Sequence, residues 1–186
     1  MRILLAAAAL ALSACGQTDT TAPNASACAR SATHEVTWSS ATPDTITTQS
    51  GGPSCAQAVV TFVVRNADGD PLWAFASTYY DLTMGGVPPG GATPVSNEQM
   101  DEFLRGWADV TEQRTGDLPE WREGFDSLSA SAQTFSYDTP FDRETYEMLR
   151  ARNLQMICYA AAVEGSQCLI VDPASHAPIM MVAYGP

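Results

Sequence analysis

Lysine is absent from this 186-residue chain, and all nine basic residues are arginines. The absence excludes a P-loop lysine, a Schiff-base lysine and a serine–lysine dyad. Histidine is scarce too, with only His34 and His176. No C-x-x-C pair occurs, and neither histidine stands at metal-ligand spacing. The glycines of segment 85–94 lack the pattern of a phosphate cradle. We therefore expect no metal and no cofactor.

Long apolar runs are also missing. The longest, residues 3–12, has ten residues, whereas a membrane-spanning helix needs about 20. Arg2 precedes this run, and the small residues Ser13 and Ala14 follow it. A positive start, an apolar middle and a small-residue cleavage site are typical of a secretory signal peptide. We expect residues 1–14 to be this signal.

The residues Leu12-Ser13-Ala14-Cys15 resemble the lipobox of bacterial lipoproteins. The resemblance implies cleavage before Cys15, and acylation of that cysteine would anchor the exported chain in a lipid bilayer. Gly16 stands where an aspartate would resemble an inner-membrane retention signal, which favours the outer membrane, facing the periplasm. The alternative is an ordinary cleaved signal without lipid, because Ala14 also suits general signal peptidases.

Cleavage there would leave eight arginines against 21 acidic residues, a formal charge of −13. Such an acidic surface repels phosphates, so the sequence predicts no nucleic-acid partner. It would attract cations or a basic envelope protein, such as a lysozyme-like hydrolase. The alternative is that the acidity keeps an anchored domain soluble and away from anionic lipid.

Four further cysteines are present: Cys28, Cys55, Cys158 and Cys168. An even number in an oxidising compartment predicts two disulfides, and four cysteines permit three pairings. We favour Cys28–Cys55 and Cys158–Cys168, because each pair brackets a segment that closes locally. A zinc site is the alternative.

Composition divides the chain into a lipidated tether (15–32) and one globular domain (33–186) that is long enough to bury a core. We expect an α+β fold in which two or three helices pack on an antiparallel sheet of about five or six strands. The expected order is a hairpin, then helices, then a C-terminal three-stranded meander.

The hairpin joins residues 56–65 and 71–80 through Asp68-Gly69, for which a type I′ turn is expected. In this register Val64 faces Trp73 and Phe62 faces Phe75. A first strand is predicted at 34–38, followed by a loose region at 39–56. The meander strands are predicted at 154–163, 167–172 and 178–185, with Cys158 opposite Cys168.

Ser96 and Gln99 predict a capping box. The helix that follows is expected to bury a stripe of apolar residues and to expose its acidic face to solvent. The stripe contains Met100, Phe103, Leu104, Trp107 and Thr111. A second helix is expected within 113–128 and a strand at 133–137. A third helix should begin at Thr139-Pro140, bury Phe141, Thr145, Met148 and Leu149, and end at Asn153.

Tyr79, Tyr80 and Asp81 form the ligand patch that the sequence favours most, at a strand end beside the glycine-rich segment 85–94. Aromatic rings with an acid suit a basic or sugar ligand. The alternative is that the rings close the core. The leading functional hypothesis is a non-enzymatic, membrane-anchored domain that binds or scaffolds a periplasmic partner. The other hypotheses are a carboxylate-based cell-wall hydrolase and a small-ligand binder gated by segment 85–94.

Overall fold

The computed structural model describes residues 27–87, 89–131 and 135–186. The expected signal peptide, Cys15 and most of the expected tether lie outside the described residues. The described chain confirms the α+β class. Its strands, however, form two antiparallel sheets, of four and five strands, rather than a single sheet.

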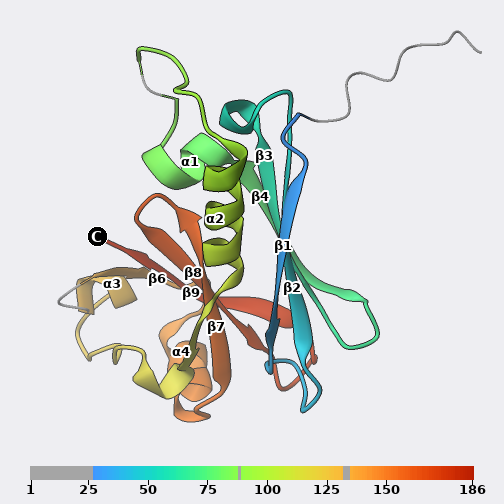
Figure 1. Cartoon of the computed structure of the whole chain (residues 1–186). Helices are drawn as coiled ribbons and strands as arrows, with labels where there is room; N and C mark the ends of the chain where they lie inside the picture. The colour runs from blue at the N-terminus through green and yellow to red at the C-terminus, as the bar shows by residue number, and fades with distance from the viewer. Residues whose placement is uncertain (1–26, 88, 132–134) are drawn as a thin grey trace, which may run out of the picture.

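Sheet A has the order β1-β2-β3-β4, and sheet B has the order β5-β7-β8-β9-β6 (Figure 1). Sheet A consists of β1 (Arg30–Val36), β2 (Asp44–Gly51), β3 (Val59–Arg65) and β4 (Pro71–Thr78). Sheet B consists of β5 (Thr111–Arg114), β6 (Ser136–Asp138), β7 (Gln155–Ala162), β8 (Gly165–Val171) and β9 (Pro178–Gly185). The α-helices are α1 (Tyr79–Met84), α2 (Asn97–Ala108), α3 (Leu128–Ser131) and α4 (Arg143–Ala151), and the 3-10 turns are η1 (Cys55–Gln57) and η2 (Thr115–Asp117).

Sheet B separates two cores, because alternate residues of a strand point to opposite faces. Ile157 and Tyr159 of β7 pack into the core that sheet A and α2 complete, and the Tyr159 ring stacks on Phe62 at 4.5 Å. Met156 and Cys158 face the second core, to which α4 contributes residues. The second core explains why the strands divide into two sheets: sheet B is covered on both faces.

The β3–β4 register is confirmed, with Val64 opposite Trp73 and Phe62 opposite Phe75. The expected type I′ turn is wrong, because Gly69 has a positive φ of 86° and Asp68 does not. The connection is a longer loop in which the Asn66 Oδ1 atom accepts the N–H groups of Asp68 and Asp70. A polar side chain therefore closes the loop in place of a two-residue turn.

The capping box at Ser96 is confirmed. Helix α2 ends at Ala108, so Thr111 lies in β5 and not on the predicted helical stripe. Helix α4 is capped by Asp142, whose carboxylate accepts the Thr145 N–H at 2.8 Å. The prediction that Met148 is buried is wrong, since 48% of it is exposed.

Other local predictions were also wrong. The region predicted to be loose contains β2, and the first strand begins at Arg30 instead of 34. The segment predicted as a strand through Tyr80 turns into α1 at Tyr79. No helix fills 113–127, which contains β5, η2 and a connection to the short α3. The three C-terminal strands, with Cys158 opposite Cys168, are confirmed.

Candidate functional site

The side chains of the predicted ligand patch, Tyr79, Tyr80 and Asp81, make contacts within the fold. Tyr80 is buried, and its hydroxyl donates to the Thr93 carbonyl at 2.7 Å. The Tyr79 ring packs edge-on against Phe103, and burial raises the pKa of its hydroxyl. Asp81 accepts the Thr78 hydroxyl at 2.6 Å at the start of α1. The three residues lie together in the first turn of α1, where Asp81 binds the N-cap Thr78 and Tyr80 holds the chain that follows the helix.

A better candidate lies where β7 extends beyond β5. Strand β5 pairs with β7 only from Thr111, opposite Cys158, to Arg114, opposite Gln155. In the part of the chain that the structure describes, β7 has no strand partner on this side after Cys158. The Trp107 indole N–H takes the place of a strand, because it donates to the Ala160 carbonyl at 2.8 Å.

The register shows why Ala160 is available to Trp107. Cys158 and Cys168 have Cα atoms 4.0 Å apart, the narrow spacing of an antiparallel pair without mutual hydrogen bonds. Cys158 and Ala160 therefore direct their peptide groups away from β8, towards β5 and α2. The open edge of β7 and the second half of α2 bound a groove of about 460 Å³, which we call the α2–β7 groove.

The groove exists because small residues line parts of both its walls. Gly106 contributes no side chain, and a Cβ added there would have no atom within 4 Å. Ala160 on the opposite wall contributes only a methyl group. The Phe103 and Trp107 rings, with centroids 5.6 Å apart, form the apolar part of the lining.

Two carboxylates give the α2–β7 groove its charge. Glu102 and Asp109 both line it and are exposed, and no arginine or histidine belongs to the described lining. His34 is not part of the groove lining, but its Nε2 atom lies 3.9 Å from Asp109 Oδ1. Asp101, next to Glu102 in α2, forms an ion pair with Arg30 of β1, and the hydrogen bond from Arg30 lowers the pKa of the Asp101 carboxyl. The groove is therefore an acidic site with an aromatic lining.

A second hollow, of about 380 Å³, brings Ser39, Ser40, Asp68 and His176 together from three turns. The Ser39 hydroxyl donates to Asp44, and the Ser40 hydroxyl donates to the Thr42 carbonyl. Both hydroxyls are thus engaged within their own turn. A catalytic triad needs the hydroxyl directed at the imidazole, so we do not assign nucleophilic catalysis to this hollow.

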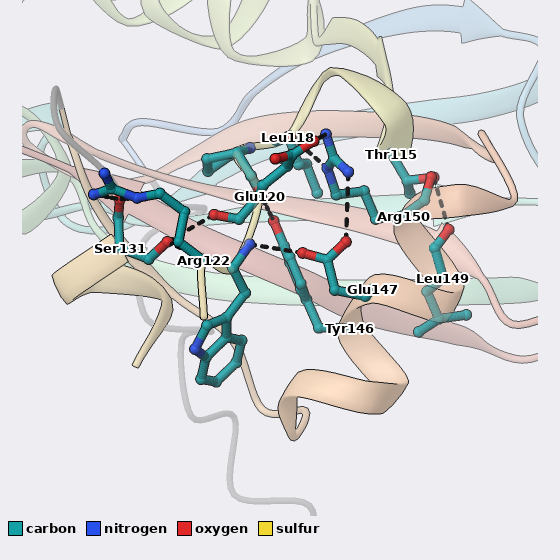
Figure 2. A network of polar contacts seen from close by, with 11 residues as sticks. Thr115, Leu118, Glu120, Arg122, Ser131, Tyr146, Glu147, Leu149 and Arg150 are labelled. Atoms are coloured by element: carbon teal, nitrogen blue, oxygen red, sulfur yellow. Dashed lines mark hydrogen bonds and ion pairs between the residues drawn. The ribbon is translucent and has the colours of Figure 1, made fainter. Parts of the chain in front are cut away.

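A network of polar contacts lies at α4, which packs in the second core (Figure 2). Glu147 accepts the Trp121 N–H at 2.6 Å, and Arg150 Nε donates to the Leu118 carbonyl at 2.7 Å. The Tyr146 hydroxyl donates to the Pro119 carbonyl at 2.7 Å, and burial raises the pKa of this tyrosine. These side chains bind backbone groups of the segment before α3, so the network holds that segment on α4.

The disulfides Cys28–Cys55 and Cys158–Cys168 form as predicted. In the described ranges, no group of three or more histidine, cysteine or acidic residues is arranged to hold a metal ion. None of the described helices is both long enough and apolar enough to cross a bilayer.

Sequence reasoning placed Glu102, Phe103 and Trp107 correctly on a helix but did not recognise the site. It assigned Phe103 and Trp107 to the core, and Glu102 and Asp109 to the solvated face. The signal that was available is Gly106, a helix-weakening residue between the aromatic and acidic positions. No protein-family model matches the chain, and no curated protein or solved structure matches it either.

Proposed function

We propose that the protein is a lipid-anchored module of the bacterial envelope that binds a basic protein through the α2–β7 groove. The observation that carries the proposal is the lining of the groove: two exposed carboxylates and two aromatic rings, with no arginine or histidine. The lipobox-like residues at Cys15 support the anchoring.

The chemistry of the groove suits an arginine or lysine side chain. A cation close to an exposed aromatic face gains about 0.5–1 kcal/mol. The half-buried Phe103 offers such a face, whereas Trp107 is only 5% exposed, and the nearby carboxylates add charge complementarity. The chain as a whole has an excess of acids over bases, with a formal charge of −12. A field of this sign steers basic proteins towards the surface at low ionic strength.

The same arrangement favours binding over hydrolysis. In a glycosidase, the general acid is a carboxyl whose pKa is raised by an apolar pocket. Here 76% of the Asp109 side chain is exposed, and Glu102 is exposed as well. Neither carboxylate is desolvated, so the groove offers charge but no environment that prepares a proton donor.

The test is capture from envelope extract by the full mature protein, with captured proteins identified by mass spectrometry. One variant, Glu102→Gln/Asp109→Asn, neutralises the groove. A control variant, Glu123→Gln/Asp126→Asn, removes two exposed charges from the connection before α3 and changes the net charge equally. We expect a basic protein to be captured by wild type and control at low salt, and to be lost from the groove variant.

A second variant separates shape from charge. Gly106→Met adds a neutral side chain at a lining position where a Cβ would have no atom within 4 Å, and methionine favours helix more than glycine does. We expect it to reduce capture at least tenfold while thermal stability is kept. Capture that is insensitive to salt, or that the groove variants leave unchanged, contradicts the proposal. Turnover of cell-wall fragments that depends on Glu102 would favour the hydrolase instead.

A further inference from the structure

Exposed apolar side chains gather at one end of the molecule. Met84, Val87 and Val163 are 62%, 61% and 49% exposed, and they are three of the seven exposed large apolar residues in the described chain. Met84 ends α1, and Val87 follows it in the connection to α2. A Cβ added at Gly85 would lie 3.9 Å from Val163 Cγ1, so the β7–β8 turn meets this connection. We call these three residues the apolar end patch.

The connection that carries Val87 is uncharged throughout. Residues 85–96 contain no acidic or basic residue, although the chain has 21 acids. The described part of this connection projects beyond the neighbouring elements in Figure 1. The Tyr80 hydroxyl binds the Thr93 carbonyl at 2.7 Å, so the returning half of the connection is fastened to α1.

The chain enters the domain at this same end. Cys28 is bonded to Cys55 in η1, and Cys55 Sγ lies 3.4 Å from Asn97 Oδ1 at the start of α2. The Tyr79 N–H at the start of α1 binds the Ala58 carbonyl just after η1. Both helices that flank the uncharged connection therefore contact the region where Cys28 is fixed. In Figure 1 the blue start of the described chain, just before β1, lies at the same end of the molecule as this connection.

The length of the segment before Cys28 limits where the domain can sit. Thirteen residue steps separate Cys15 from Cys28, which allows a separation of about 45 Å at most. A lipid on Cys15 thus holds Cys28, and the end of the domain that carries it, within about 45 Å of the bilayer. Apolar side chains on an uncharged segment can enter the lipid interface, whereas the acidic surface elsewhere is repelled by anionic headgroups.

We infer that the apolar end patch rests on the bilayer surface as a second, non-covalent contact that orients the anchored domain. The inference rests on the lipid anchor of the proposed function, and it does not depend on the groove. Asp81 and Glu98 stand at the base of the connection and are exposed. The contact is therefore confined to the interface and does not extend to deep insertion.

The test uses the mature lipoprotein reconstituted into vesicles of phosphatidylethanolamine with a minority of phosphatidylglycerol. The described cysteines are all paired, so Val87→Cys adds a single free thiol for an environment-sensitive fluorophore once Cys15 is acylated. The matched control is Ala174→Cys in the β8–β9 turn. That turn shares a hollow with the β1–β2 turn, at the opposite end of β1 from Cys28.

We expect the label at position 87 to shift to shorter wavelength and to be quenched severalfold more strongly by nitroxide lipids than the label at position 174. Equal, weak quenching at both positions in protein that floats with the vesicles would overturn the orientation and leave the anchor intact. Protein that does not float and carries an unmodified Cys15 would overturn the anchor, and the orientation with it.

Discussion

Replacement of Thr115 by valine should strongly destabilise the domain, although the two side chains are nearly the same size. Thr115 is fully buried in η2. Its hydroxyl donates to the Leu149 carbonyl at 2.9 Å and accepts the Leu154 N–H at 2.9 Å. One hydroxyl thus joins the last turn of α4 to the residue that precedes β7.

The magnitude follows from the groups that valine leaves unpaired. The Leu149 carbonyl stands in the last turn of α4, where carbonyls lack a full set of helical partners, and the Leu154 N–H loses its acceptor. Each buried polar group without a partner costs about 1–3 kcal/mol. We expect Thr115→Val to lower the free energy of unfolding by about 2–4 kcal/mol in total.

Urea unfolding of the oxidised protein is the assay. With a denaturant dependence of about 1–3 kcal/mol per molar, the midpoint should fall by about 1–2 M. Thr115→Ser is the control, because it keeps the hydroxyl and loses one buried methyl group, at a cost of about 1 kcal/mol. A valine variant as stable as the serine variant would refute the assignment of this hydroxyl as the connection between η2, α4 and β7.

Three further predictions concern α2, sheet A and the contact between the sheets. Ser96→Ala removes the acceptor of the Gln99 N–H and should lower thermal stability by about 1 kcal/mol, while Ser96→Asp should keep it. Gly52→Ala should strongly destabilise the domain, because the added Cβ would lie 2.8 Å from the Ala58 backbone. In the control Gly51→Ala, the added Cβ has no atom within 4 Å, so this variant should unfold at the same urea concentration as wild type. Burial raises the pKa of Tyr159 from 10 to about 12, so between these pH values the hydroxyl loses its proton only in the unfolded chain, and the stability of the fold decreases as pH rises. Tyr159→Phe should therefore make the decline of the urea midpoint over this pH range shallower than in wild type. An unchanged decline would contradict the raised pKa of Tyr159.

Local chemistry in the sequence was enough to predict the elements whose partners are close in the chain. The β3–β4 register follows from one loop and two alternating strands, and the box at Ser96 needs only four residues. The Cys158–Cys168 pair follows from the β7–β8 hairpin in the same way. In each case, the residues that decide the structure are fewer than about twenty positions apart.

Elements stabilised by distant partners could not be predicted in this way. Strand β2 reads as a loose serine- and threonine-rich stretch, because its strand character comes from pairing with β1 and β3 and from the burial of Ile46 and Thr48. The Thr48 hydroxyl donates to the Leu104 carbonyl of α2, 56 residues away. Such a contact turns a polar residue into a core residue, and no periodicity in β2 indicates it.

The groove was missed for a related reason. Phe103 and Trp107 are core residues along most of their surface, as the helical stripe predicts. They become the lining of a site only because β5 begins at Thr111, opposite Cys158, and leaves the edge of β7 beyond Cys158 open. Whether two strands have the same length depends on the tertiary structure, and local sequence patterns do not encode it.

The position of the groove on α2 decides what a partner must recognise. Trp107 is ten residues along α2 from Asn97, a rise of about 15 Å at 1.5 Å per residue. On the proposed lipid anchor, a basic protein at the surface also meets anionic headgroups, whose field decays with a Debye length of about 8 Å at physiological ionic strength. Those headgroups attract basic proteins too, and charge alone would leave such a protein on the lipid. A partner held in the groove must therefore also fit its aromatic lining, so Gly106→Met, which changes no charge, should release it as effectively as neutralising the two carboxylates.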